Sequence, residues 1–355
     1  MNKERVFINL KGITKQMPFR EYYRQRNTSI GKIIADKLEL PLVVGEQNSK
    51  DHYHVMAKTV TKEIAREFNI SSPEDFYGVV VDHLQQVEKS VFYPVVGTSF
   101  PGHYSTKFSK QVRDSVLKGY SFFDLEGALA AHQKLSYFGK LRLKLLPNSD
   151  GHGQFKITTD DEFREILNKV DENKLAEFGA VIEPNLFEAN TTSVGEIRLG
   201  DDVYSFLAFQ KDDIASEDGR NRYMGADLIT IRGTMENLLD LNEAGLVLDQ
   251  VKKAVSFHQA YSYFKPVISR ISYDVLCGTD FKGDVQIGVT DITARLGGSC
   301  PAVMLGVKVL DSDFTTEAVR AEVDLNYQPE VIEAGSEIFI NHPTLTITAK
   351  VTQII

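Results

Sequence analysis

Cysteine is scarce in this chain, which contains only Cys277 and Cys300 among its 355 residues. Two cysteines are too few for a disulfide framework or a structural zinc site, so we expect two reduced thiols. The sequence also has no run of 18 apolar residues, and its first residues contain no long apolar core. It therefore predicts neither a membrane span nor a signal peptide, and the cytoplasm is the default location.

A cationic excess is absent as well. The formal net charge is −9, which argues against non-specific binding of nucleic acid or of anionic membranes, because both need a positive surface. An anionic substrate would need lysine and arginine side chains gathered locally. With 42% hydrophobic and 25% charged residues, the chain has the composition of a globular protein with two or three lobes.

Familiar nucleotide-binding and catalytic patterns are missing too. Neither GxxxxGK[ST] nor GxGxxG occurs, so the P-loop and dinucleotide-binding interpretations have no support. Cys300 has no paired base by spacing, and we interpret it as a buried small residue. His52 and His54 would share one face of a strand, but no third ligand accompanies them, which favours a structural role.

Apolar periodicity divides the chain into segments. Short apolar runs alternate with helical stretches over residues 1–100, which indicates an α/β lobe. A helical pattern follows, in which Asp124 caps one helix. A polar loop at 212–222 has no apolar periodicity and is a candidate lid. The other predicted elements are strands at 141–145 and 154–158, a helix at 160–170, a strand at 180–183, a meander at 193–211, a helix at 244–263 and a strand at 344–351.

Two carboxylates are predicted to face each other in a hairpin. Residues 271–279 and 285–293 alternate apolar and polar side chains, and a two-residue turn at Lys282 and Gly283 would join them. This register places Asp274 opposite Asp291, with side chains about 5 Å apart. Facing carboxylates are stable only with a cation between them or with one acid protonated, and magnesium bridging nucleotide phosphates is a common such cation. A slipped register with both acids in solvent is the alternative.

A cationic strand leads into a glycine-rich loop. Lys144 and Arg142 share one strand face, and Gly151 to Gly153 follow shortly afterwards. Backbone amides of glycines can approach phosphate oxygens closely while the ammonium group supplies charge. This pattern suits phosphate binding, and an exposed strand edge with a tight turn is the alternative.

Other candidates stand near the ends of apolar strands. The segment from Glu183 to Leu186 ends a buried strand, and its proline leaves backbone groups unpaired that could face a purine edge. The alternative is that this segment is a plain connector. Arg270, Arg295 and Lys211 are charged residues beside apolar strands, where each needs solvent or an anionic partner.

The order of these pieces resembles that of the ATP-grasp superfamily. The chain is more closely similar to an uncharacterised ATP-grasp-related family, designated only as a domain of unknown function, over about residues 100–355. The segments that carry the resemblance are LRLKLLPNSDGHGQ, VIEPNL, TTSVGEIRL, YMGADLITIRG, YDVLCGTD and DITARLGGSCPA. It implies an α/β (α+β) ATP-grasp fold with an N-terminal α/β pre-grasp lobe at 1–103, a small lobe with the glycine-rich loop at 104–190, and a C-terminal mixed lobe at 191–355.

The resemblance also implies ATP and Mg²⁺ as cofactors and gives roles to individual residues. Where the ATP-grasp pattern has E-x-N-x-R, the present chain has Asp291 and Thr293 before Arg295, which weakens a second metal position. The implied roles are Asp274 and Asp291 as magnesium ligands; Lys144, Gly151, Gly153 and Lys107 or Lys110 at the phosphates; Glu183 and Leu186 at the adenine; Glu196 or Glu188 at the ribose; and Lys144, Arg295 and Arg270 as catalytic cations.

The implied activity is that of an ATP-dependent ligase. A small-molecule or peptide carboxylate would be activated as an acylphosphate, which an amine or similar nucleophile then opens. An ATP-binding protein without turnover and an ATP-grasp kinase are the alternatives, because the fold does not determine the acceptor.

Overall fold

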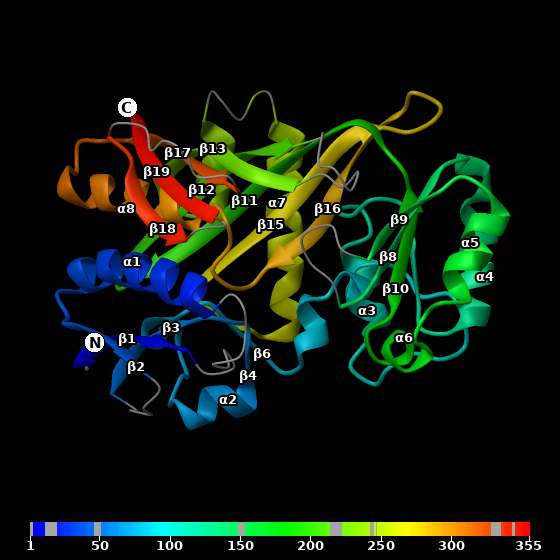
Figure 1. Cartoon of the computed structure of the whole chain (residues 1–355), viewed down its shortest axis with the longest axis horizontal. Coiled ribbons are helices and arrows are strands. Elements are labelled where there is room, and N and C mark those ends of the chain that lie inside the picture. The colour runs from blue at the N-terminus through cyan, green and yellow to red at the C-terminus, as the bar shows by residue number, and fades with distance from the viewer. Residues whose placement is uncertain are drawn as a thin grey trace.

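Four β-sheets organise the part of the chain that the computed structural model describes (Figure 1). The described residues are 3–10, 20–45, 51–147, 153–213, 222–241, 245, 247–327, 335–342 and 345–355. No helix among them is long and apolar enough to cross a membrane. The candidate lid at 212–222 falls largely outside these residues, as does Gly151.

The N-terminal part contains a parallel sheet with helices, which confirms the predicted α/β character of this lobe. Its order is β2-β1-β3-β5, formed by Leu42–Gly45, Arg5–Asn9, His52–Met56 and Phe76–Tyr77. Helix α1 (Arg20–Leu38) packs against β1 and β2 of this sheet. It also contacts helix α8 and strand β18, which is an edge strand of the largest sheet. A second small sheet contains β4 (Val60–Thr61) and β6 (Val79–Val81), with α2 (Lys62–Glu67) after β4; its third strand is β14 (Val267–Ile268), which comes from much later in the chain.

The central part is an antiparallel sheet covered by helices. Its strand order is β7-β10-β8-β9, formed by Tyr120–Phe122, Ala180–Pro184, Leu141–Leu145 and Gln154–Ile157. Asp124 caps α4 as predicted, because its carboxylate accepts a hydrogen bond from the Gly127 amide at 2.5 Å. Helices α4 (Leu125–Leu135), α5 (Asp160–Leu167) and α6 (Glu172–Phe178) complete this lobe, which has a hydrophobic cluster of its own.

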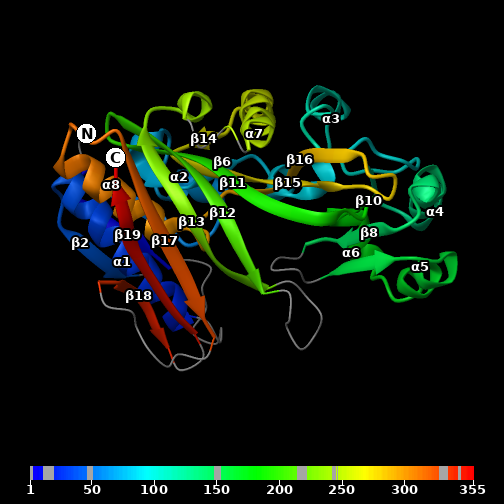
Figure 2. The ribbon, with the colours of Figure 1, turned by 90° about the horizontal axis from the view of Figure 1, so that it is seen from above.

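The largest sheet has eight strands in the order β16-β15-β11-β12-β13-β17-β19-β18. Successive residues of its strands point to opposite faces: Ile197 packs with the cluster of α8, whereas Val194 packs with the cluster of α7. Figure 2 shows these helices on either side of the sheet. The element bounds are α7 Leu248–Tyr261, α8 Cys300–Ser312, β11 Phe187–Leu199, β12 Asp202–Asp213, β13 Arg222–Arg232, β15 Arg270–Thr279, β16 Val285–Thr293, β17 Ala318–Asn326, β18 Glu337–His342 and β19 Leu345–Ile354.

The β15–β16 hairpin confirms the facing acids but not the predicted turn. Thr279 pairs with Val285, so five residues form the loop, and the Asp280 carboxylate accepts hydrogen bonds from the amides of Lys282 and Asp284. This register alone would misplace the acids by one residue. A bulge between Asp274 and the next pair restores the offset, and Asp274 lies opposite Asp291.

Candidate functional site

The acid pair lies on the face of the large sheet that α8 also covers, and neighbouring strands fix its geometry. Ser193 Oγ on β11 donates to Asp274 Oδ1 at 2.6 Å, and Gln210 Nε2 on β12 donates to the same Oγ at 2.8 Å. The amide of Ile292 donates to Asp291 Oδ1 at 2.9 Å. Three adjacent strands and a backbone amide therefore orient the two carboxylates before any ligand binds.

The electrostatics of the pair favour a cation. Burial, followed by the negative charge of Asp291, raises the pKa of Asp274 to about 6, although the Ser193 hydrogen bond opposes the shift. A divalent cation between the carboxylates would offset both effects. Magnesium is commonly held by one or two carboxylates together with phosphate oxygens, so this oxygen donor set fits the ion.

Lys89 is a part of the site that sequence reasoning missed. It lies in the short 3-10 turn η3 (Lys89–Val91), which packs against β10 of the central sheet and β16 of the large sheet. Its Nζ lies 3.0 Å from Asp291 Oδ2, and its side chain is only 10% exposed. Burial disfavours the ammonium form, but the charges of Asp291, Glu88 and Asp274 outweigh burial and raise the pKa of Lys89.

Glu88 adds a third carboxylate to this environment. Burial and then the charge of Asp291 raise the pKa of Glu88 to about 7, while the positive charges of Lys89 and Arg295 oppose the shift. Arg295 therefore lies close enough to influence this group, and its own side chain is exposed. The available sequence signal was a charged Glu-Lys pair directly before a buried apolar segment.

Lys144 and Glu183 form a buried ion pair on the central sheet. Lys144 Nζ lies 2.6 Å from Glu183 Oε1, and the side chains are 8% and 1% exposed. Tyr93 Oη donates to Glu183 Oε2 at 2.8 Å. Burial lowers the pKa of Lys144; Glu183 opposes this, and the positive charge of Lys89 adds to it. Lys144 is thus near Lys89, which contacts Asp291, although these residues are far apart in sequence.

Backbone and amide contacts fix the predicted hinge from Glu183 to Leu186. Arg142 Nη2 donates to Asn185 Oδ1 at 3.0 Å, and the Asn185 amide donates to the Lys140 carbonyl at 2.9 Å. Asn185 Nδ2 also donates to the Leu186 carbonyl at 3.4 Å. The Glu183 carboxylate is engaged by Lys144 and Tyr93, and the residue pairs with Arg142 of β8. An adenine contact by this segment stays a prediction.

The glycine-rich loop is described only at its end. Gly153 has a φ of 66°, which favours glycine. Its carbonyl accepts a hydrogen bond from the Leu145 amide at 2.8 Å, next to Lys144 on β8. Gly151 lies outside the described residues. The phosphate role of the loop remains a prediction.

Glu196 is not brought to the acid pair. Ser193 pairs with Asp274, whereas Glu196 pairs with Ile271 and therefore points to the opposite, α7-covered face. Its carboxylate accepts hydrogen bonds from Arg198 Nη2 at 2.8 Å and from the Met235 amide at 3.1 Å. This placement does not support a ribose contact. Its rival, Glu188, is exposed near the hinge, with a φ of 50°.

The earlier lysines also lie elsewhere. Lys107 and Lys110 are exposed on α3 (Thr106–Gln111), which packs against α7. Lys107 Nζ lies 5.5 Å from the ring centroid of Tyr263, just after α7. No described contact joins either lysine to Lys144, so a phosphate contact by Lys107 is not supported by its position.

Arg270 is corrected from a catalytic to a positioning residue. Its side chain is fully buried, and Nη1 donates to the carbonyls of Thr293 at 2.6 Å and Arg295 at 2.7 Å. It therefore holds the backbone that carries Arg295 and has no surface for a substrate. Lys211 is engaged outside the site by Asp227 at 2.8 Å.

The remaining sequence candidates do not form a metal or nucleophile site. Cys300 is buried, and its Sγ accepts a hydrogen bond from the Gly297 amide at 3.2 Å. His52 and His54 are buried on β3. Among the described residues, no group of three or more His, Cys, Asp or Glu side chains could hold a metal ion. The acid pair would therefore need ligand oxygens, such as those of a nucleotide, to complete a coordination shell.

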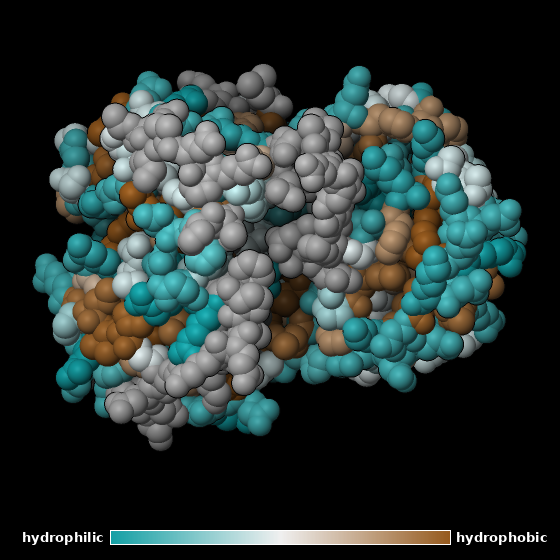
Figure 3. Space-filling model, viewed as in Figure 1, coloured by the Kyte–Doolittle hydropathy of each residue, from teal (hydrophilic) through white to brown (hydrophobic). Residues whose placement is uncertain are grey.

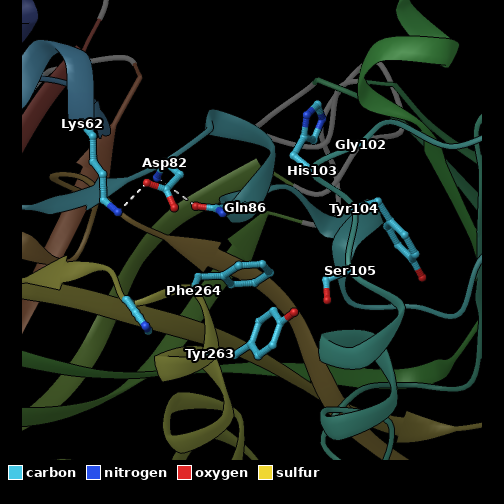
Figure 4. A pocket seen from close by; sticks show the side chains of 10 residues that line it. Lys62, Asp82, Gln86, Gly102, His103, Tyr104, Ser105, Tyr263 and Phe264 are labelled. Carbon is cyan, nitrogen blue, oxygen red and sulfur yellow. Dashed lines mark hydrogen bonds and ion pairs between the residues drawn. The ribbon is translucent and has the colours of Figure 1, made fainter.

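The surface is hollowed between the lobe of β8, β9 and β10 and the rest of the molecule (Figure 3). Lys144 comes from that lobe, and Asp291 from the other side. A separate cavity of about 350 Å³ contains neither residue (Figure 4). Lys62 and Asp82 form a 2.5 Å ion pair there, and the other lining residues are Gln86, Gly102, His103, Tyr104, Ser105, Tyr263, Phe264 and Lys265.

Solved structures share this architecture over nearly the whole chain. An N5-carboxyaminoimidazole synthetase from Staphylococcus aureus, complexed with ADP, is 12% identical, with a TM-score of 0.53 and coverage of 99% of this chain and 95% of that chain. The phosphoribosylamine–glycine ligase of Thermotoga maritima is 14% identical, with a TM-score of 0.55 and coverage of 97% and 89%. The biotin carboxylase domain of Hydrogenobacter thermophilus 2-oxoglutarate carboxylase, solved with MgADP, ADP and bicarbonate, is 12% identical, with a TM-score of 0.55 and coverage of 99% and 87%.

These similarities show that the chain has the ATP-grasp fold, as the ordered motifs predicted. At this level of identity they show the fold alone. A family pattern also matches residues 17–346, and the chain belongs to that family, described as "Protein of unknown function (DUF3182)". No curated protein matches the chain.

Proposed function

We propose that the protein is an ATP-dependent ligase that joins a carboxylate to an amine or similar nucleophile. A carboxylate oxygen would attack the γ-phosphorus of ATP, and the bond from that phosphorus to the bridging oxygen of ADP would break. The amine would then attack the acyl carbon, lose a proton and release phosphate. The observation that carries this proposal is the facing Asp274–Asp291 pair within an ATP-grasp fold, with Lys89 in contact with Asp291 and Lys144 near Lys89.

The described residues have distinct parts in this proposal. Asp274 and Asp291 would hold Mg²⁺, which when bound supplies positive charge to the phosphate oxygens. The Lys144 ammonium has three donors; one serves Glu183, and the others are available to phosphate. Arg295 is exposed beside Glu88 and could bind the anionic substrate, while Arg270 positions it through its backbone carbonyl. Catalysis would rest on positioning and charge, so no side-chain nucleophile is needed.

The similar structures support a nucleotide ligand. The Staphylococcus aureus synthetase is described as complexed with ADP, and the Hydrogenobacter thermophilus carboxylase domain with MgADP and bicarbonate. A synthetase, a ligase and a carboxylase on the same fold favour a reaction at a carboxylate, although the fold alone does not set the substrate.

A second candidate is a nucleotide-binding protein without turnover. The ion pair between Lys89 and Asp291 favours it, because an ammonium group already neutralises one proposed magnesium ligand. A kinase of the same fold is distinguished from a ligase by its product, a phosphorylated acceptor instead of free phosphate.

The test has two stages. Calorimetric titration with ATP, with and without Mg²⁺, should show magnesium-dependent binding that Asp291→Asn weakens and Asp284→Asn leaves unchanged. Asp284 is the matched control because it is an exposed carboxylate in the same hairpin. ADP and phosphate release is then measured with pools of carboxylic acids and amines. Release that requires both pools supports the ligase; binding without release supports the second candidate; and absence of ATP binding contradicts both.

A further inference from the structure

Lys89 lies against the acid pair and contacts one of its members, Asp291. Asp291 has both carboxylate oxygens engaged: Oδ1 accepts the Ile292 amide at 2.9 Å, and Oδ2 lies 3.0 Å from Lys89 Nζ. On Asp274, Oδ1 accepts from Ser193. Each carboxylate oxygen has two lone pairs, so one ion between the acids is still possible. A second ion bound through Asp291 Oδ2 would meet the ammonium group.

Lys89 is built into the fold at this place. Its side chain is 10% exposed, and η3 is held between β10 and β16. The ammonium is therefore unlike an exposed surface lysine, which could turn into solvent when a metal ion approaches. Within a few ångströms, a fixed positive charge strongly opposes a second dication.

Thr293 is the next residue along β16 on the same face as Asp291, and it also argues against a second metal ion. Asp291 pairs with Asp274 and Thr293 with Ser272, so both project from one face of β16. A threonine hydroxyl is a weaker metal ligand than a carboxylate or an amide carbonyl. The Thr293 carbonyl is occupied by Arg270. A second metal position at Asp291 Oδ2 thus has a cation already present and no strong further ligand from β16.

We infer that Lys89 takes the place of a second metal ion, so that the site binds one divalent cation per chain, between Asp274 and Asp291. This inference rests on the proposed role of the acid pair in the ligase reaction. In that role, Lys89 would supply to the phosphate oxygens the charge that a second ion would otherwise provide.

The test counts bound Mn²⁺, which accepts the same oxygen ligands, by the electron paramagnetic resonance signal of the free ion, with and without saturating ADP. The wild type and Lys89→Arg should each bind one ion. Lys89→Met should bind two, with the first bound on the order of tenfold more tightly, because the opposing charge is gone. Asp291→Asn should weaken the first ion.

Several outcomes would overturn the inference. Two Mn²⁺ ions bound to the wild type, or one bound to a folded Lys89→Met variant, would show that Lys89 does not determine how many metal ions each chain binds. The wild-type count decides the matter even if Lys89→Met does not fold, which circular dichroism would reveal. ADP binding is measured separately by calorimetry, and its absence would contradict the proposed function. If ADP binds, a wild-type count other than one Mn²⁺ ion overturns the inference alone.

Discussion

Replacing Glu183 by Gln would test the buried ion pair with Lys144. The glutamine can still accept from Tyr93, but the Lys144 ammonium loses its partner at 2.6 Å in a place where it is 8% exposed. Removing one member of a buried pair typically costs about 3–5 kcal/mol. We therefore expect Glu183→Gln to lose about 3 kcal/mol of unfolding free energy at pH 7, roughly a hundredfold in the unfolding equilibrium.

The loss should depend on pH with a defined sign. The pKa of Lys144 is already below its ordinary value because of burial, and removal of Glu183 lowers it further. Between the folded and unfolded pKa values the unfolded chain binds more protons, so stability rises with pH. The deficit of Glu183→Gln should therefore be largest near pH 7 and smaller at pH 9.5, because the unpaired Lys144 ammonium loses its proton more readily as the pH rises.

Urea unfolding at both pH values measures these effects. Glu177→Gln is the matched control, an exposed glutamate on α6 that should change stability by less than about 0.5 kcal/mol. Adding Lys144→Met to Glu183→Gln should restore much of the loss, because a pair replaced by uncharged groups leaves no unpaired charge. A loss below about 1 kcal/mol, or an equal loss at both pH values without rescue, would refute the reasoning.

Three further variants extend the test to the large sheet. Asp274→Asn should stabilise the metal-free protein by roughly 1–3 kcal/mol at pH 7. The pKa of Asp274 is raised to about 6, so ionisation of its carboxyl lowers the stability of the folded protein as the pH rises towards and past that value. Urea unfolding with a chelator should show that the gain vanishes near pH 4. Gly288→Ala should cost at least about 2 kcal/mol, because its Cβ would lie 2.2 Å from the Leu117 amide nitrogen; an unchanged melting temperature would contradict this. Arg270→Lys should cost about 1.5–3 kcal/mol by losing a charged hydrogen bond, whereas exposed Arg295→Lys should change thermal stability little.

The acid pair could be predicted because it depends on a local hairpin. Alternation along two adjacent strands fixed which face Asp274 and Asp291 share. The turn was wrong because the Asp280 side chain closes a longer loop, and the bulge at Thr290 compensates for it. A bulge has no clear periodicity signal, so the correct pairing was reached through an incorrect turn.

The rest of the site depends on contacts between distant segments. Lys144 was identified from its strand, but the Glu88-Lys89 pair before an apolar segment does not by itself show that Lys89 lies between the two sheets. Glu196 shows how a motif can mislead: it follows Ser193 by three residues, an odd offset, so the pleat sends the two side chains to opposite faces. The fold was predicted from ordered segments, whereas individual ligands require the register.

The joining of β14 to β6 has a consequence for motion. Ser269 and Arg270 amides both approach the Gly78 carbonyl, at 3.1 and 3.2 Å, and the Gly78 amide donates to Ser269 Oγ at 2.9 Å. These hydrogen bonds connect the N-terminal part directly to the first residue of β15, the strand that contains Asp274. The two parts should therefore move as one body, and any closure over a bound nucleotide would fall to the lobe of β8, β9 and β10.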